Sequence, residues 1–311
     1  MQPLITIFSA PKPFRDEHIS MIQMNAIRSW QQLGNQVAVV LIGDEEGIRE
    51  AAEELGVGFI PDVARNSQGT PLISSIFALA RSSNESPLLA YVNADIILFE
   101  DFIDVALKVQ RLAEKFLIVG QRFDLDVKSP VRFTSDWQIR LKEQVKISGR
   151  YHPRGGSDYF IYARACFQQI PEFAVGRAGW DNWMFYEARR QGWQVVDATG
   201  SILIIHQDHD YAHLPGGQAH YRLPETGENV RLAGGKRTIF TLQDANYTFS
   251  SGKLTRIKKR GKDFWREVEI FPLTKLKSRF LGNLTFGLFH PRKAIQEIRA
   301  FLYAKRVKAV K

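Results

Sequence analysis

Short apolar runs alternate with helical patterns through the first third of the chain. Apolar residues stand at helical spacing over residues 18–33, and Gly34-Asn35 ends this pattern. Residues 37–42 are continuously apolar, which is typical of a strand buried on both faces. The other elements predicted here are strands at 4–8, 57–60 and 88–92 and helices at 45–55 and 71–80. This order predicts a parallel sheet with helices on both faces.

The rest of the sequence has a mixed α/β pattern. Its predicted helices lie at 102–115, 136–147 and 181–191, and its strands at 116–120, 159–162, 193–197 and 201–205. No low-complexity linker or internal repeat separates the halves, so we predict one domain over residues 1–218. Beyond it, residues 238–242 and 247–249 predict a hairpin, and residues 273–289 and 294–310 predict basic amphipathic helices.

Charge is unevenly distributed along the chain. Residues 251–311 contain 17 Lys or Arg and 4 Asp or Glu, whereas the net charge of the whole chain is +9. The body is therefore slightly acidic and the C-terminal segment strongly basic. A basic segment indicates an anionic partner, which is a membrane surface, a nucleic acid or an acidic substrate. Its basic residues alternate with Phe, Leu and Ile at helical spacing, which favours a membrane surface.

The cellular location is predicted from what the sequence lacks. Its single cysteine, Cys166, cannot form an intramolecular disulfide, and we expect it to be a small apolar residue of the interior. No window reaches the roughly 18 apolar residues of a membrane-spanning helix. The first ten residues carry no positive charge and do not resemble a signal peptide. We therefore expect a cytoplasmic protein whose basic segment can associate with the cytoplasmic face of a membrane.

Asn93-Ala94-Asp95 follows the fourth predicted strand. Ligands of parallel sheets bind beyond the carboxyl ends of the strands, where we expect the loops at 9–13, 43–46, 62–70 and 93–97. The Asp95 carboxylate is well placed there to bind Mg²⁺ or Mn²⁺, either of which neutralises a diphosphate leaving group. The alternative is that Asp95 caps the next turn.

Gly179-Trp180-Asp181-Asn182-Trp183 stands where a helix is predicted to begin. A carboxylate at this position can accept backbone N–H groups and can deprotonate a sugar hydroxyl. The two tryptophans offer flat faces on which sugar rings stack. The alternative is an ordinary aspartate cap beside two core tryptophans.

Three histidines and two aspartates fall within residues 206–213, directly after a predicted strand. His206 and His209 could bind a metal, although no cysteine or HExxH pattern supports a separate zinc site. The alternative is a polar loop with titrating surface histidines. A weaker motif, Arg154-Gly155-Gly156-Ser157-Asp158, lets the backbone approach a ligand closely, and Ser157 and Asp158 could bind sugar hydroxyls.

The order of these motifs resembles the GT-A superfamily of glycosyltransferases. An α/β half ends in an Asp-x-Asp-like motif, and a Gly-Gly strand entry, an acid at a helix start and a histidine after the next strand follow. The sequences WDNW and HQDHDYAH are similar to those of family-2-like bacterial glycosyltransferases, and the second half loosely resembles the carboxyl-terminal region of inverting galactosyltransferases. The resemblance covers about residues 4–218. It implies a GT-A-type Rossmann-like nucleotide-binding sheet over about 1–120, a mixed α/β acceptor and metal half over about 121–218, and a basic C-terminal extension over 219–311.

The resemblance also implies a role for each matching residue. Asp95 matches the acid that binds metal and diphosphate, whereas Asn93 replaces the first acid of that motif, so a charge is missing. Asp181 matches the catalytic base of inverting members, and His206 or His209 completes the metal shell. Trp180 and Asn182 match residues that bind the acceptor. The residues implied for the nucleotide or donor, besides Asn93 and Asp95, are Ser9, Pro11, Asp44, Arg65, Gly156 and Asp158.

We therefore expect a glycosyltransferase that moves a sugar from a nucleoside-diphosphate donor to an acceptor hydroxyl with inversion, assisted by Mn²⁺ or Mg²⁺. The implied partners are the nucleotide sugar, a glycan or lipid-linked acceptor and a membrane surface, with no nucleic acid. A nucleotidyltransferase would favour a glycine-rich loop after the first strand, and Ser9-Ala10-Pro11-Lys12-Pro13 has no glycine. The remaining alternative is a nucleotide-sugar, membrane or nucleic-acid binding module with a decayed catalytic site.

Overall fold

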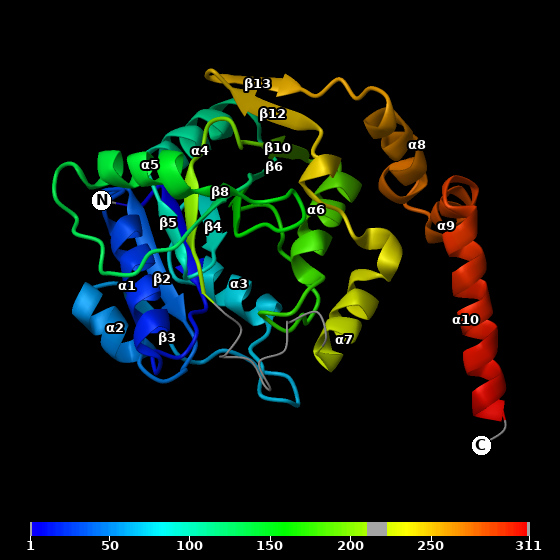
Figure 1. The fold of residues 1–311 in the computed structure, drawn as a ribbon, viewed down its shortest axis with the longest axis horizontal. Coiled ribbons are helices and arrows are strands. Elements are labelled where there is room, and N and C mark those ends of the chain that lie inside the picture. Colours follow the sequence, from blue (N-terminus) through cyan, green and yellow to red (C-terminus); the bar gives the residue numbers. More distant parts are fainter. Residues whose placement is uncertain (1, 210–222, 310–311) are drawn as a thin grey trace.

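The computed structural model describes residues 2–209 and 223–309, and a nine-stranded sheet forms its centre (Figure 1). The strands of this sheet are β1 (Ile5–Ser9), β2 (Val37–Ile42), β3 (Gly58–Ile60), β4 (Leu88–Val92), β6 (Phe116–Val119), β9 (Tyr159–Ala163), β10 (Gln194–Asp197), β12 (Tyr247–Ser250) and β13 (Lys253–Arg256). Their order is β13-β12-β10-β6-β9-β4-β1-β2-β3. Strand β9 is antiparallel to β4 and β6, and β13 to β12, whereas the other neighbours are parallel. The predicted α/β class is confirmed.

Side chains of the central strands alternate between two apolar cores. In β4, Leu88, Ala90 and Val92 enter one core, and Leu89 and Tyr91 enter the other. Because helices cover both faces of the sheet, a central strand must be apolar along its whole length. Continuous apolar runs in the sequence therefore predicted these strands. The helices that cover the first core are α1 (Glu17–Gln31), α2 (Ile48–Leu55) and α4 (Asp101–Leu112). Those that cover the second are α3 (Ile73–Ser82), α6 (Trp180–Arg190), α7 (Pro224–Ala233) and α8 (Lys262–Thr274).

Local chemistry accounts for where these helices start and stop. Asp16 caps α1 by accepting a hydrogen bond from the Ile19 N–H at 2.8 Å. Helix α2 ends at Gly56, whose φ of 64° lies in the left-handed region. Helix α3 starts two residues later than predicted, because Pro71 pairs with Arg65 in an isolated bridge.

A second, four-stranded sheet lies beside the first, and the sequence patterns do not predict it. Its strands, in order, are β5 (Ile96–Leu98), β11 (Ile204–Gln207), β7 (Phe123–Leu125) and β8 (Arg150–Tyr151). Helix α5, over Trp137–Ser148, packs on it, and the Trp137 ring stacks on Phe99 at 5.5 Å. The strand predicted at 201–205 is β11, shifted by three residues at its start. This sheet matters for function because it carries His206.

The predicted hairpin between residues 238–242 and 247–249 is wrong. Residues 238–242 fall across two short 3-10 turns, η3 (Lys236–Thr238) and η4 (Leu242–Asp244). The Asp244 carboxylate accepts a bond from the Thr241 N–H at 3.0 Å and pairs with Arg266 at 2.9 Å, which favours a turn over a strand. The actual hairpin, β12 and β13, extends the central sheet through β10. The boundary at residue 218 stays a prediction.

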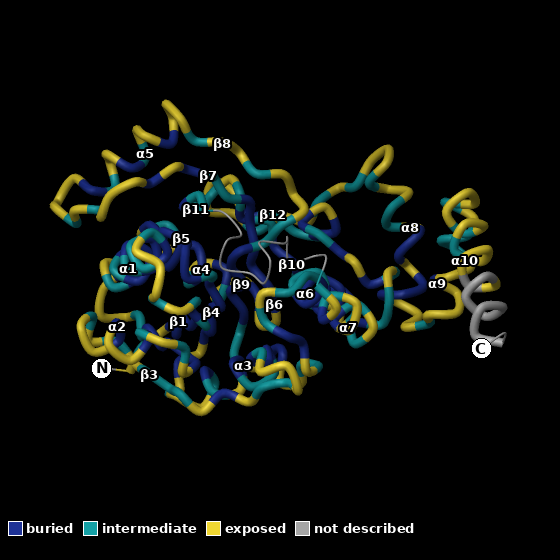
Figure 2. The backbone as a smooth tube through the Cα atoms, turned by 60° about the horizontal axis from the view of Figure 1, so that its bottom comes forward, coloured by how far each residue is buried: buried dark blue, intermediate teal, exposed yellow. Residues whose placement is uncertain are grey.

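The C-terminal helices lie at one end of the molecule, remote from β1 to β3 (Figures 1 and 2). Helix α9 covers Arg279–Phe289 and α10 covers Pro291–Ala309, close to the predicted ranges, whereas α8 is additional. None of the described helices combines the length and the apolar character needed to cross a membrane. Cys166 is buried, as predicted for an apolar interior residue.

Candidate functional site

The candidate site forms where the parallel strands β4, β1 and β2 end at one edge of the central sheet. Lys12 follows β1, Asp44 follows β2 and Asp95 follows β4. Because these strands are parallel neighbours, the loops that follow them are brought together at this edge. The sequence predicted ligand loops at this edge.

Asp95, His206 and His209 converge at this edge of the sheet. One ligand atom of each lies within 4.8 Å of the others, and His209 Nε2 is 3.1 Å from Asp95 Oδ2. Asp95 Oδ1 is buried and has no hydrogen-bond partner among the described residues. A buried carboxylate oxygen left without a partner is costly, so this atom fits a cation that the three side chains would share.

The pairing of strands places His206 beside the Asp95 loop. In β11, His206 stands opposite Ile96 of β5 on one side and opposite Asp124 of β7 on the other. The next residue, Gln207, is fully buried and donates its backbone N–H to the Asp95 carbonyl at 3.2 Å. The second sheet therefore holds the histidine and the acid of the candidate metal group in register.

Lys12 is a further charged group of the site that the sequence patterns did not single out. Its Nζ donates to Asp95 Oδ2 at 3.4 Å and lies 3.0 Å from His209 Nε2. The buried Gln23 fixes the Lys12 backbone by accepting from its N–H at 2.7 Å and donating to its carbonyl at 3.0 Å. Burial alone would raise the pKa of Asp95, but Lys12 and the two histidines hold that pKa well below its usual range.

A second group of carboxylates and histidine, Asp124, His206 and Asp208, shares His206. Asp124 already bonds to Arg122 at 2.8 Å and to His152 Nδ1 at 2.8 Å, and Asp208 pairs with Arg150 at 2.5 Å. These cations compensate both acids, so this group needs no metal. His206 Nδ1 lies 3.2 Å from Asp124 Oδ1. In metal sites, a carboxylate at one ring nitrogen of a histidine commonly orients the other ring nitrogen toward the metal.

The titration of this group follows from its contacts. Burial alone would raise the pKa of Asp124, but the neighbouring His206 and His152 rings and the Arg122 guanidinium hold this pKa well below its usual range. Burial alone would lower the pKa of His206, but Asp124 and the charge of Asp95 raise it above its ordinary value. The carboxylates therefore stay ionised around the candidate metal group.

Asn93 and Asp158 form one hydrogen-bonded unit. The Asn93 Nδ2 donates to Asp158 Oδ1 at 3.0 Å, and its backbone N–H donates to the Asp158 carbonyl at 2.9 Å. Arg122 Nη1 lies 2.6 Å from both carboxylate oxygens of Asp158. Asn93 thus holds the buried Asp158, which explains why an amide suits the position where the related motif has an acid.

Asp44 and Arg65, both predicted to contact the nucleoside, lie together after β2 and β3. The Arg65 guanidinium pairs with Asp44 and, at 2.9 Å, with Glu45, and it donates to the Gly69 carbonyl at 2.8 Å. This cluster is partly open to solvent, with Asp44 exposed. Its role in binding a nucleoside stays a prediction.

Ser9, Pro11 and Gly156 are the other predicted donor residues. Ser9 and Pro11 are buried at the end of β1, and the Ser9 Oγ has no hydrogen-bond partner among the described residues. Contact of either side chain with a nucleotide would need the loop to move. A Cβ at Gly156 would lie 3.5 Å from His152 Nε2, so this turn sits beside the Asp124 network without requiring glycine.

Asp181 lies in the first turn of α6, as predicted from the sequence. Its Oδ1 accepts a bond from the Gly179 N–H at 3.2 Å. Burial raises the pKa of Asp181 above its ordinary value, the bonds from backbone N–H groups oppose this shift, and the charge of Asp158 adds to it. Asp181 is therefore electrostatically coupled to Asp158, the carboxylate that Arg122 and Asn93 hold.

The residues flanking Asp181 are engaged within the protein. The Trp180 ring is buried and lies edge-on to Tyr91 at 5.0 Å. Trp183 is buried as well, against Phe173 at 5.4 Å. Asn182 Nδ2 donates to the Phe240 carbonyl at 2.8 Å. Both tryptophans therefore belong to the core, and the roles of Trp180 and Asn182 toward an acceptor stay predictions.

Several residues of the site escaped sequence reasoning: Lys12, Arg122, Asp124, His152 and Gln207. Arg122 and Asp124 directly follow a predicted strand, so their position alone could have marked them. His152 carries no such signal, since only the pairing of β7 with β8 brings its loop to Asp124.

Gln207→Leu is expected to destabilise the fold by about 2–4 kcal/mol, because it leaves buried polar partners unsatisfied. Gln207 Nε2 donates to the Ile22 carbonyl at 2.7 Å and to the Asp95 carbonyl at 3.1 Å, and its Oε1 accepts from Asn25 Nδ2 at 3.0 Å. Urea unfolding measures the change. The exposed Gln36→Leu is the control, expected to stay within about 0.5 kcal/mol of wild type. Equal stability of both variants would contradict this account.

Among the comparisons with known proteins, only the comparison with solved structures found proteins similar to this chain. No protein-family model matches this chain, and neither does any curated protein. Mannosyltransferase PcManGT from Pyrobaculum calidifontis, in complex with GDP-Man and Mn²⁺, is 10% identical over 68% of this chain and 59% of that chain, with a TM-score of 0.45. S. aureus TarS 1-349 in complex with UDP-GlcNAc is 11% identical over 75% of this chain and 65% of that chain, with a TM-score of 0.46.

A third similar structure is glucosyl-3-phosphoglycerate synthase from Mycobacterium tuberculosis, in complex with Mn²⁺, UDP and phosphoglyceric acid. It is 12% identical over 67% of this chain and 72% of that chain, with a TM-score of 0.43. This chain spans less than two thirds of the length of the first two structures. At such identities and TM-scores the similarity assigns no activity, and the chemistry has to be argued from the residues of this chain.

Proposed function

We propose that this chain is a glycosyltransferase that moves a sugar from a nucleoside-diphosphate donor to an acceptor hydroxyl. One observation supports this most strongly: Asp95, His206 and His209 meet around an unpartnered, buried carboxylate oxygen at the carboxyl edge of the sheet. Such an edge is where α/β sheets bind nucleotides.

The metal-binding part of the proposal follows from the donor set. Asp95, His206 and His209 would hold the cation, and two imidazoles with one carboxylate favour Mn²⁺ over Mg²⁺, which prefers oxygen ligands. When bound, such a cation neutralises the charge that develops on a diphosphate leaving group. Lys12, whose ammonium group lies among these ligands, adds a positive charge for the diphosphate.

The donor's nucleoside is expected at the Asp44 and Arg65 cluster. Strand β2 is two strand spacings from β4, roughly 10 Å across the sheet. This separation suits a nucleoside whose diphosphate reaches Asp95. Asp158, which Arg122 and Asn93 hold, is expected to accept a bond from a sugar hydroxyl.

Asp181 is the proposed base of a single displacement. It takes the proton of the acceptor hydroxyl while that oxygen bonds to the anomeric carbon and the bond from this carbon to the diphosphate breaks. One attack from the side opposite the leaving group inverts the anomeric centre. The raised pKa of Asp181 suits a proton acceptor, since a more basic carboxylate takes a proton more readily.

Association with a membrane is the last part of the proposal. The helices α8 to α10 expose large apolar side chains next to many basic residues. A helix with this composition binds at the interface of an anionic membrane, where its apolar face enters the lipid. This surface suits an enzyme whose acceptor is linked to a lipid.

Nucleoside diphosphates are expected to raise the melting temperature only when Mn²⁺ is present. Binding to the folded state alone stabilises it, and the diphosphate needs the cation to sit beside Asp95. Differential scanning fluorimetry with a panel of nucleoside diphosphates, with Mn²⁺ or with EDTA, measures this effect. The matched nucleoside monophosphates are the control and should shift the melting temperature little. A nucleotide effect that EDTA leaves unchanged would contradict the metal site.

A further inference from the structure

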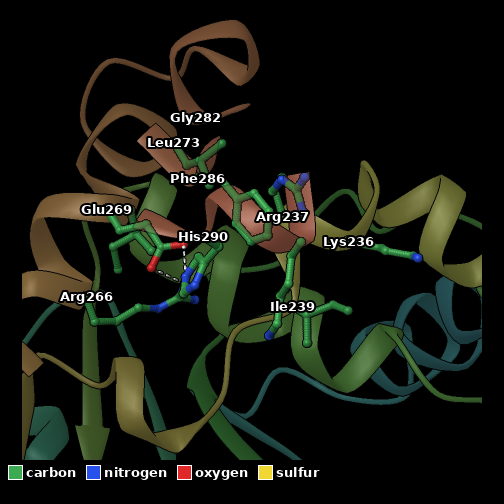
Figure 3. Close-up of a pocket in the computed structure, with 11 residues that line it drawn as sticks. Lys236, Arg237, Ile239, Arg266, Glu269, Leu273, Gly282, Phe286 and His290 are labelled. Atoms are coloured by element: carbon green, nitrogen blue, oxygen red, sulfur yellow. Dashed lines mark ion pairs between the residues drawn. The ribbon is translucent and has the colours of Figure 1, made fainter. Parts of the chain in front are cut away.

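A cavity of about 200 Å³ lies between the turn η3 and the helices α8, α9 and α10 (Figure 3). None of its lining residues belongs to the Asp95 site. Its charged and titratable lining consists of Lys236, Arg237, Arg266, Glu269, His290 and Lys293. With four Lys or Arg against one Glu, the cavity is lined for an anion.

The one acid of the cavity is already compensated. Glu269 Oε1 lies 3.2 Å from His290 Nε2, and Glu269 Oε2 lies 3.3 Å from Arg266 Nη1, as the dashed lines of Figure 3 show. Arg266 also pairs with Asp244 at 2.9 Å. These contacts compensate Glu269 and Arg266, so the lysines carry the remaining positive charge of the lining.

Lys293 and Arg237 supply the donors toward an anion in the cavity. Among residues 2–209 and 223–309, Lys293 forms no ion pair, and its side chain is exposed. The Lys236 side chain points away from the other labelled residues in Figure 3. Arg237 pairs with Glu297, but its Nε is buried without a hydrogen-bond partner in the described structure. Buried donors are normally satisfied, so an acceptor oxygen is expected near this atom.

Apolar side chains form the rest of the wall. The Arg237 guanidinium lies 3.3 Å from the centre of the Phe286 ring, and Leu273 and Ile270 close the floor. A second hollow of about 500 Å³ shares Ile239, Arg266, Glu269 and His290 with the first and is lined by Trp265 and Phe289. A basic recess joined to an aromatic one suits an amphiphile with an anionic head.

The helices around the cavity expose apolar side chains at helical spacing. The exposed residues are Phe264, Trp265, Val268 and Phe271 in α8, Phe280, Leu284 and Leu288 in α9, and Ile295, Ile298 and Leu302 in α10. In Figure 2, α9 and the first part of α10 are mostly coloured as exposed. The helices that line the cavity therefore also carry the surface that suits a lipid interface.

We propose that this cavity binds the phosphate of an anionic lipid and so sets how the protein sits on the membrane. The inference rests on the membrane contact in the proposed function and adds a specific headgroup site to it. The segment after η3 links this site to the catalytic half, since the carbonyl of Phe240, next to Ile239, accepts the bond from Asn182 beside Asp181. Lipid binding would thus fix the membrane relative to the proposed base.

The test compares vesicles of phosphatidylcholine that carry equal negative charge as phosphatidic acid or as oleic acid. The full-length protein is expected to bind the phosphatidic acid vesicles about tenfold more tightly, as charge-assisted hydrogen bonds to phosphate allow. In Lys293→Ala this ratio should fall to about one. Lys275→Ala removes the same charge from an exposed residue outside the cavity and should keep the ratio.

Other results would overturn the proposal. A ratio near one in the wild type, or an equal loss in both lysine variants, would mean that only general electrostatics act. Displacement from vesicles by inorganic phosphate as effective as by a short-chain phosphatidic acid would identify free phosphate as the ligand, and displacement by single-stranded RNA would identify a nucleic acid.

The lipid assay is independent of transfer chemistry. It contains neither donor nor metal, and Asp95→Asn should bind vesicles as the wild type does. A variant that loses turnover but binds lipid normally would therefore bear only on the proposed function. A variant that loses lipid binding but keeps turnover would bear only on the cavity. Melting temperatures of the two lysine variants check that the exposed substitutions preserve the fold.

Discussion

Asp95→Asn is expected to lower donor turnover by ~10³-fold and to abolish measurable Mn²⁺ binding. An asparagine keeps the shape of the side chain and removes its charge, which Lys12 and both histidines stabilise. Losing the charged ligand removes several kcal/mol of stabilisation from the leaving diphosphate, and about 4 kcal/mol corresponds to this fold-change. Donor consumption and isothermal titration with Mn²⁺ measure the two effects.

The matched control for this variant is Asp104→Asn. Asp104 is exposed in the first turn of α4 and belongs to no group of candidate metal ligands. Turnover and Mn²⁺ affinity should both stay near wild type. If Asp95→Asn retained full turnover, Asp95 would be a turn cap and not a metal ligand. Retained Mn²⁺ binding with lost turnover would move the metal to the Asp124 group.

Asp181→Asn is expected to lower kcat by ~10²–10⁴-fold while Mn²⁺ affinity stays unchanged. The amide cannot accept the acceptor's proton, yet its oxygen can still accept the Gly179 N–H that the carboxylate holds. Single-turnover kinetics and Mn²⁺ titration separate the two readouts. The control is Glu187→Gln, the same chemical change later in α6, where the carboxylate bonds to Arg190 and Gln191. Normal kcat in Asp181→Asn would remove Asp181 from the mechanism.

The pH dependence of turnover gives a second readout of Asp181. A base must be deprotonated to act, so the rate should rise as pH passes upward through its pKa and then level off. Because burial and the charge of Asp158 raise this pKa, the acid limb should lie above the ~3.9 of an ordinary aspartate. The residual rate of Asp181→Asn should lack this limb. If the rate of the variant rose with pH in the same way as that of the wild type, the titration would belong to another group.

The patterns of the sequence predicted most strands of the central sheet, although not β13 or its pairing with β12. A strand covered on both faces needs a continuous apolar run, and β2 and β4 show one, so their places could be predicted within a residue or two. The second sheet could not be predicted in this way. Strands β7 and β8 have three and two residues, and runs this short carry no measurable periodicity.

The residues of the candidate site were likewise predicted only in part from the sequence. Residue type and order indicated Asp95, Asp181, His206 and His209, because each stands at the end of a strand or the start of a helix. They could not show that Lys12 lies against Asp95, since this contact joins residues 83 positions apart. Both tryptophans beside Asp181 are buried in the core, a point that the sequence left open, because an aromatic side chain looks the same in sequence whether it faces a ligand or the core.

The sequence by itself determined the α/β class, most strands of the central sheet, the basic C-terminal segment and the acids and histidines able to carry chemistry, because these depend on periodicity, charge and local residue type. Only the tertiary structure decided which of them meet. The pairing of β11 between β5 and β7 places His206 next to Asp95 and Asp124, and the packing of α8 to α10 against η3 forms the basic cavity. Both depend on contacts between distant segments, which no local pattern encodes.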